Sequence, residues 1–140
     1  MNLRPYQLTA LEALKQHNKG VCVLPTGSGK TTIFLQDVKT RLESATGLLN
    51  IVVVAPKILL ASQLASQFKS YLKDFDNIFI TDVHSGENGI TNSSAIRTTN
   101  RMIRSMNLHH ILFTTYKSLP RILEAGIEID VAIFDEAHHS

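Results

Sequence analysis

Residues 49–55, LNIVVVA, form an uninterrupted apolar run that is rich in β-branched side chains. Such a run is typical of a strand that is covered on both faces, as strands are in parallel sheets. Parallel neighbours must be joined by crossover connections, which are usually helices. The run therefore predicts an α/β fold in which helices flank a parallel sheet.

The rest of the chain repeats this alternation of strands and helices. Further strands are predicted over 21–24, 78–83, 110–115 and 131–134, and helices over 5–17, 30–43, 56–72 and 117–124. Residues 84–100 are rich in Ser, Thr, Asn and Gly and predict a loop, followed by a short helix that ends near Met106. We therefore expect a parallel sheet of about five strands with right-handed crossovers.

The composition fits one soluble domain. The chain has 140 residues, of which 44% are hydrophobic and 19% charged, and its net charge of +2 is compatible with a nucleic-acid partner. No apolar run is long enough for a membrane span, and no signal peptide is evident. The single cysteine, Cys22, excludes an internal disulfide and fits core packing. We expect a cytoplasmic protein with no membrane partner.

The segment PTGSGKTT, residues 25–32, is the strongest local motif. It lies between a predicted strand and a predicted helix, which is the context of a phosphate-binding loop. Its glycines allow backbone N–H groups to face phosphate oxygens, Lys30 reaches the β- and γ-phosphates, and the Thr31 hydroxyl ligates Mg²⁺. The strict pattern places a glycine where this chain has Leu24. The predicted nucleotide contacts are Pro25, Thr26, Gly27, Ser28, Gly29, Lys30, Thr31 and Thr32.

A second motif follows the last predicted strand, in IDVAIFDEAHHS. Asp135 and Glu136 come directly after the apolar residues, and ligands of open α/β sheets bind at the carboxyl ends of strands. Asp135 is predicted to hold Mg²⁺ through water, and Glu136 to orient and deprotonate the attacking water. The predicted catalytic residues are Lys30, Asp135 and Glu136, and the predicted metal ligands are Thr31 and Asp135.

PTGSGKTT followed by DEAHH resembles superfamily 2 helicases of the DEAD/DEAH type, a group that includes the motor subunits of type I and type III restriction enzymes. The resemblance implies an N-terminal RecA-like ATP-binding domain over residues 1–140, which uses ATP and Mg²⁺ to move on nucleic acid. We expect DNA or RNA as the partner and favour DNA. The resemblance also implies a second RecA-like domain and a motif III, neither of which these residues contain.

Three shorter segments match the same family in the correct order. LRPYQ resembles the glutamine motif, in which Gln7 pairs with the adenine edge while Tyr6 or Arg4 packs near the base. Residues 55–63 resemble motif Ia, although Lys57 and Ile58 stand where the family often has Thr and Arg. Residues 114–119 resemble motif Ib. The implied nucleic-acid contacts are Pro56, Lys57, Gln63, Thr115, Tyr116, Lys117 and Ser118.

The resemblance also implies a strand order. In helicase-type domains the strand after motif II lies between the phosphate-loop strand and the motif II strand, and here it would begin beyond residue 140. We therefore expect strands 21–24 and 131–134 to lie about 10 Å apart, separated by a slot. Direct pairing of these two strands is instead expected of the kinase and GTPase class.

Other interpretations remain open at this stage. The chain is alternatively a nucleic-acid-binding or assembly module that kept the fold without hydrolysing ATP, or a small-molecule kinase or GTPase, although no lid and no Asn-Lys-x-Asp motif is evident. The pairs His109–His110 and His138–His139 are adjacent along the chain, so their side chains are expected to point to opposite faces of a strand, and no zinc site is predicted. A basic surface from Lys69, Lys73, Arg97, Arg101 and Arg104 is no more favoured than ordinary solvated helix faces.

Overall fold

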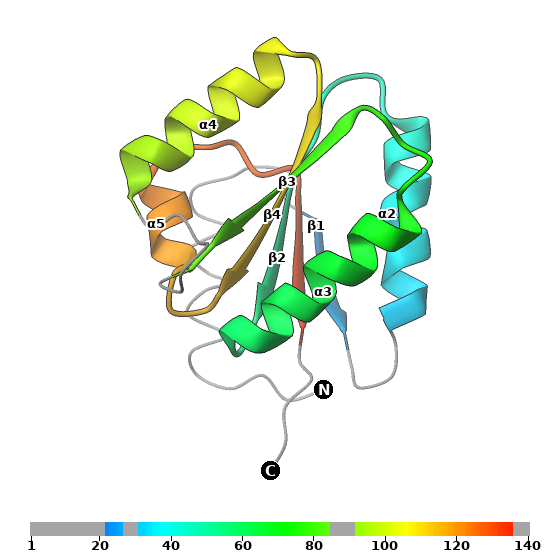
Figure 1. Ribbon diagram of the computed structural model, residues 1–140, viewed down its shortest axis with the longest axis horizontal. Coiled ribbons are helices and arrows are strands. Elements are labelled where there is room, and N and C mark those ends of the chain that lie inside the picture. The colour runs from blue at the N-terminus through cyan, green and yellow to red at the C-terminus, as the bar shows by residue number, and fades with distance from the viewer. Residues whose placement is uncertain (1–21, 27–30, 85–91, 136–140) are drawn as a thin grey trace.

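The computed structural model describes the backbone of residues 22–26, 31–84 and 92–135, and the side chains of residues 35–84 and 92–134. Five parallel strands form one sheet in the order β1-β5-β2-β4-β3 (Figure 1). The strands are β1 (Cys22–Thr26), β2 (Asn50–Ala55), β3 (Ile78–Val83), β4 (His109–Thr115) and β5 (Val131–Asp135). The helices are α2 (Thr31–Ser44), α3 (Ile58–Tyr71), α4 (Ser93–Ser105) and α5 (Leu119–Glu124). The helix predicted over 5–17 lies outside the described residues.

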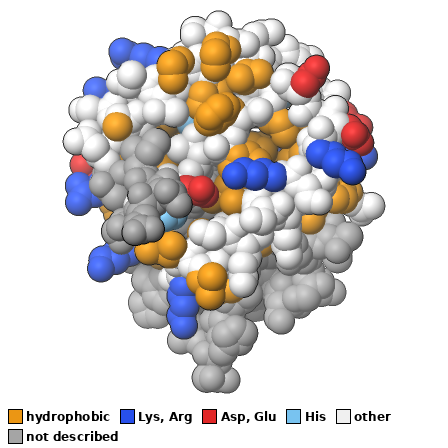
Figure 2. Space-filling view, in the orientation of Figure 1, with side chains coloured by type: hydrophobic (Ala, Val, Ile, Leu, Met, Phe, Trp, Pro, Cys, Tyr) orange, Lys and Arg blue, Asp and Glu red, His pale blue; other side chains and the backbone are white. Residues whose placement is uncertain are grey.

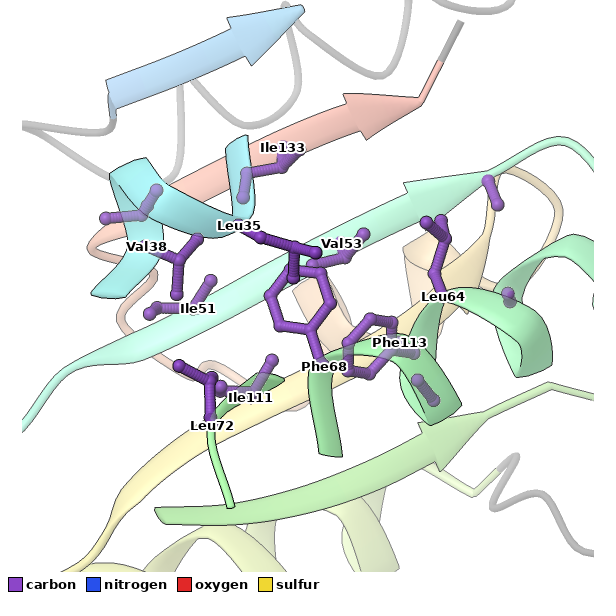
Figure 3. Close-up of a cluster of buried hydrophobic side chains, with 14 of the residues drawn as sticks. Leu35, Val38, Ile51, Val53, Leu64, Phe68, Leu72, Ile111, Phe113 and Ile133 are labelled. Atoms are coloured by element: carbon purple, nitrogen blue, oxygen red, sulfur yellow. The ribbon is translucent and has the colours of Figure 1, made fainter. Parts of the chain in front are cut away.

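The sheet separates two hydrophobic cores because side chains alternate along each strand. One core joins α2 and α3 to residues such as Val53 and Phe113, and the ring of Phe113 meets that of Phe68 edge to face at 4.9 Å (Figure 3). The other core joins α4 and α5 to the alternate residues of the same strands, such as Val52 and Phe134. Every residue of β2 and β4 is buried, as expected for central strands covered on both faces. None of the described helices is long and apolar enough to cross a membrane.

The polar segment before α4 was predicted wrongly in part. The predicted loop, 84–100, includes the first eight residues of α4, which begins at Ser93. Asn92 caps this helix, and its side-chain oxygen accepts hydrogen bonds from Ser94 N at 2.8 Å and Ala95 N at 3.2 Å. The buried residues of α4 recur at helical spacing and form the face of the helix that points into the protein; they are Ile96, Asn100 and Ile103. Between residues 92 and 99, the Ser, Thr and Asn residues therefore mark a helix start and its more exposed face.

The expected slot between the phosphate-loop strand and the motif II strand is absent. β1 pairs directly with β5 over five residues, from Cys22 opposite Val131 to Thr26 opposite Asp135. A slot in the middle of the sheet leaves two rows of backbone N–H and C=O groups without partners, at a cost of about 1–3 kcal/mol for each buried group. Direct pairing satisfies these groups, so the prediction of a 10 Å separation is wrong.

Candidate nucleotide site and nucleic-acid interface

The two strongest motifs meet at one edge of the sheet. Because β1 and β5 are parallel neighbours in register, Thr26, at the start of the phosphate loop, lies opposite Asp135. Neighbouring strands are about 4.8 Å apart, so the backbones of these two residues are adjacent. The next described helix, α2, begins at Thr31. A strand thus ends just before the predicted phosphate loop and a helix begins just after it, and the described residues of both motifs include the carboxyl ends of their strands.

Only part of the predicted nucleotide site falls on described residues. Pro25 and Thr26 end β1, Thr31 and Thr32 begin α2, and Asp135 ends β5, and for these five the structure describes the backbone alone. The predicted residues outside the described part are Arg4, Tyr6, Gln7, Gly27, Ser28, Gly29, Lys30 and Glu136. Their roles stay predictions.

Motif Ia lies at the same edge, where β2 passes into α3. Ala55 ends the strand, and Lys57 is extended at φ −137° and ψ 152° before the helix begins at Ile58. Lys57 makes no side-chain cap, although its carbonyl accepts the first helical hydrogen bond, from Ala61 N at 3.0 Å. The side chains of Lys57 and Gln63 are exposed, and Pro56 is half-buried. A cation and an uncapped helix start therefore face solvent beside the end of β2.

Motif Ib follows β4 as a tight turn. Thr115 is buried, and its hydroxyl oxygen accepts a hydrogen bond from Ser118 N at 3.2 Å. Tyr116 N donates to the Ala55 carbonyl at 3.3 Å, which fastens this turn to motif Ia. Lys117 is exposed, whereas Ser118 is buried. Of the predicted contacts in this motif, Lys117 and the half-buried Tyr116 are therefore the accessible side chains.

Asp82 was missed by the sequence analysis. It lies near the carboxyl end of β3, and its Oδ1 is buried without a hydrogen-bond partner among the described residues. The signal was an acidic residue inside a largely apolar strand, IFITDV. Burying a carboxylate oxygen without a hydrogen-bond donor costs free energy. Asp82 is therefore an unusual residue, and it lies near the edge of the sheet at which the strands of the motifs end.

The two histidines of β4 point to opposite faces, as predicted for neighbours on a strand. His109 Nδ1 accepts a hydrogen bond from Leu49 N at 2.9 Å. His110 lies on the other face, within 2.8 Å of both Asn100 Nδ2 and Thr81 Oγ1. Burial, and secondarily the nearby Arg104 guanidinium, lowers the pKa of His110 to about 4 and also lowers the pKa of His109. Both imidazoles are therefore neutral at pH 7.

The tautomer of His110 follows from the polar groups around it. Asn50 Nδ2 donates to the Glu128 carbonyl at 2.8 Å, so Asn50 Oδ1 faces Asn100 and accepts from Asn100 Nδ2 at 2.9 Å. The same amide group of Asn100 must then donate to His110 Nδ1. The ring proton is consequently on Nε2 and is donated to Thr81 Oγ1. In the described part of the chain, no cluster of three or more metal-ligating side chains occurs.

Comparison with known families matches residues 1–140 to the model described as "Type III restriction enzyme, res subunit". The chain belongs to this family. Membership confirms the motif-based prediction of an N-terminal RecA-like domain of the superfamily 2 helicase type. Direct pairing of β1 with β5 had been expected of kinases and GTPases instead of helicases. Because this chain has that pairing and belongs to a helicase-type family, the pairing does not separate the two classes.

Individual relatives agree with the family. A "DNA 3'-5' translocase XPB2" from Sulfurisphaera tokodaii is 31% identical over 139 residues, which are 99% of this chain and 26% of the relative. A "Dicer-like protein 2" from Cryphonectria parasitica is 27% identical over 142 residues, covering 99% of this chain and 9% of that protein. The res-subunit domain thus spans about a quarter of the translocase and about a tenth of the Dicer-like protein.

A solved structure shows the same fold. The nuclease-deletion mutant of the Type ISP restriction-modification enzyme LlaGI, in complex with a DNA substrate mimic, superimposes with a TM-score of 0.62 at 24% identity. The match covers 97% of this chain and 15% of that one. The predicted α/β fold with a parallel sheet and flanking helices is confirmed.

Proposed function

We propose that this chain is the ATP-binding domain of a nucleic-acid translocase or helicase. The nucleic acid on which it moves is DNA, and a second RecA-like domain supplies the rest of the ATPase site. The observation that carries the proposal is the register of Thr26 opposite Asp135, because it sets the last residue of the strand before the predicted phosphate loop beside the predicted motif II acid. The family, the DNA translocase relative and the fold shared with a DNA-bound restriction enzyme support it.

The arrangement fits a magnesium nucleotide. Thr31 opens a 14-residue helix immediately after the loop, so its first-turn N–H groups and positive dipole end lie beside the loop. A threonine hydroxyl and a carboxylate form the hard oxygen donor set that Mg²⁺ prefers. When bound, the magnesium nucleotide supplies the phosphoanhydride bond whose hydrolysis releases the free energy for movement.

Each predicted site residue then has a separate role in binding or hydrolysing the nucleotide. Lys30 holds the phosphates, Thr31 and Asp135 hold the cation, and Glu136 accepts the proton of the attacking water. Gln7 selects adenine, with Tyr6 or Arg4 against the base. Lys57, Lys117 and the helix start at Ile58 position the phosphate backbone of one nucleic-acid strand at the same edge of the sheet.

Calorimetry with ATP and Mg²⁺ tests the nucleotide site. Lys30→Ala is expected to abolish binding, because it removes the cation that faces the phosphates. Lys69→Ala is the matched control, since Lys69 is an exposed lysine of α3 outside all of the motifs. Equal ATP affinity in wild type and Lys30→Ala would remove the phosphate loop from the proposal.

A further inference from the structure

A cleft of about 460 Å³ opens on the edge of the sheet opposite the motifs. It lies between α4 and residues 125–130, and it reaches Asn50, the first residue of β2. The motif edge is at Ala55, five residues further along that strand, so the two edges are roughly 16 Å apart at about 3.3 Å per residue. The cleft is therefore separate from the proposed nucleotide site.

Three arginines of α4 line one wall. Arg97, Arg101 and Arg104 are spaced by four and three residues, which places them on one face of the helix. Arg97 is held in place, with its Nε donating to the Ala125 carbonyl at 2.9 Å. The side chains of Arg101 and Arg104 are exposed, and neither guanidinium has a hydrogen bond or salt bridge to a described residue. Two fork-shaped donors thus face the cleft with no carboxylate of the described residues within salt-bridge distance.

The floor of the cleft is a rigid polar network. Asn50 and Asn100 line it, and they are 2% and 7% exposed. Their side chains bond to one another at 2.9 Å, to the Glu128 carbonyl and to His110. Because these bonds fix the middle of α4 against the sheet, the backbone of the three arginines is held in place before any ligand binds.

The opposite wall carries negative charge. Glu128 and Asp130 line it, and Asp130 Oδ2 accepts a hydrogen bond from Asn50 N at 2.8 Å. A nucleic-acid backbone has a negative charge at every step and is repelled by this wall. A peptide can place an acidic side chain at the arginines and a neutral or basic group at the other wall. On the face of the molecule that Figure 2 shows, basic side chains are scattered among acidic and hydrophobic ones over the described surface.

We infer that this cleft is a docking site for an acidic segment of a partner protein, in which a carboxylate is held by the guanidinium groups of Arg101 and Arg104. Arginine suits this role because its planar fork matches both carboxylate oxygens. The site lies away from the motif edge, so a protein bound here leaves the nucleotide and nucleic-acid contacts accessible.

The test uses the full 140-residue chain and the fluorescein-labelled peptide Glu-Glu-Gly-Gly-Lys-Lys, which offers carboxylates to the arginines and ammonium groups to the acidic wall, with binding followed by fluorescence anisotropy at low salt. Wild type is expected to bind, and Arg101→Glu with Arg104→Glu to bind at least about tenfold more weakly. Lys69→Glu with Lys73→Glu is the matched control, because it makes the same charge change at exposed positions of α3 and the turn after it. Arg101→Gln, at an exposed side chain, is expected to weaken binding in the same direction if the double variant fails to fold.

A labelled single-stranded hexathymidylate of equal length distinguishes the partner class. Its binding is expected to change by the same factor in the arginine and lysine pairs, since both alter only the overall charge. A selective loss of hexathymidylate binding in the arginine pair would assign the cleft to nucleic acid and overturn the inference. Absence of peptide binding to wild type, or equal losses of the peptide in both pairs, would also overturn it.

Discussion

The ring of Tyr116 meets the ring of Phe134 edge to face, with centroids 5.6 Å apart and planes at 79°. Tyr116 belongs to motif Ib, and Phe134 immediately precedes the motif II acid, Asp135. The strand between them, β2, is joined to both, because Tyr116 N donates to the Ala55 carbonyl and Phe134 is paired with Val54. The proposed nucleic-acid edge and the proposed catalytic strand therefore share one aromatic contact.

This contact predicts a measurable coupling energy. Edge-to-face pairs contribute about 0.5–1.5 kcal/mol beyond the burial of their area. A double-mutant cycle with Tyr116→Leu and Phe134→Leu, measured by urea unfolding, is expected to give a coupling of that size. The cycle of Tyr116→Leu with Phe68→Leu is the control, because Phe68 packs in the other core and should be additive. Additivity in both cycles would show that the Tyr116–Phe134 geometry adds nothing to stability.

Glu136 is predicted to be the base that activates water. In the longer protein that we propose this domain to belong to, Glu136→Gln keeps the shape of the side chain and removes its ability to accept a proton. Turnover is expected to fall by about 10²–10⁴-fold while ATP affinity is retained. Steady-state hydrolysis and calorimetry on the same preparation measure the two quantities. Turnover within a few-fold of wild type would exclude Glu136 as the base, whereas absence of turnover in the wild type itself would favour the assembly module.

Gln7 is predicted to confer a preference for adenine. A carboxamide can both accept from N6–H and donate to N7 of adenine, whereas guanine presents an acceptor, O6, in place of the N6 donor. Wild type is expected to bind ATP more tightly than GTP, and Gln7→Ala to reduce that difference. Competition of ATP and GTP for a fluorescent nucleotide measures both affinities. If the two nucleotides bind equally and the variant changes neither, Gln7 is not at the base.

Local pattern predicted most of the strands and helices. The apolar run 49–55 became β2 with every residue buried, and residues 78–83 became β3 with the predicted bounds. These elements were predictable because both are short runs rich in β-branched residues, which are typical of strands. The start of α4 at Ser93 was not, because its first turn is polar and the cap at Asn92 has the composition of a loop.

The order of the strands and the hydrogen-bond partners of polar side chains were harder to predict from the sequence. The pairing of β1 with β5 depends on which backbone edges can satisfy one another, and no local pattern encodes it. The partners of Asn100 are Asn50, fifty residues away, and His110, ten residues away. Single polar residues have no periodicity, so their partners emerge only from the fold. The arginine spacing on α4 was visible in the sequence, but the cleft beside it was not.

His110 makes stability depend on pH. Its pKa in the folded chain is about 4, compared with 6.5 for the unperturbed group, so the unfolded chain binds the proton more tightly. Stability from this group is complete above about pH 6.5 and is lost as the pH falls toward 4. The cause is structural as well as electrostatic, because protonated Nδ1 would face the amide donor of Asn100. His109 contributes in the same direction, since its pKa is also lowered.

The expected loss is about 2 kcal/mol in the free energy of unfolding between roughly pH 7.5 and pH 5. His110→Gln provides the comparison, because glutamine offers one acceptor to Asn100 and one donor to Thr81 but does not titrate. Urea unfolding at half-unit pH steps is expected to show a shallower decline in the variant than in wild type, with the difference beginning near pH 6.5 and growing as the pH falls toward 4. Parallel curves would mean that His110 is protonated as readily in the folded chain as in the unfolded one, and that its hydrogen bonds to Asn100 and Thr81 do not hold it neutral.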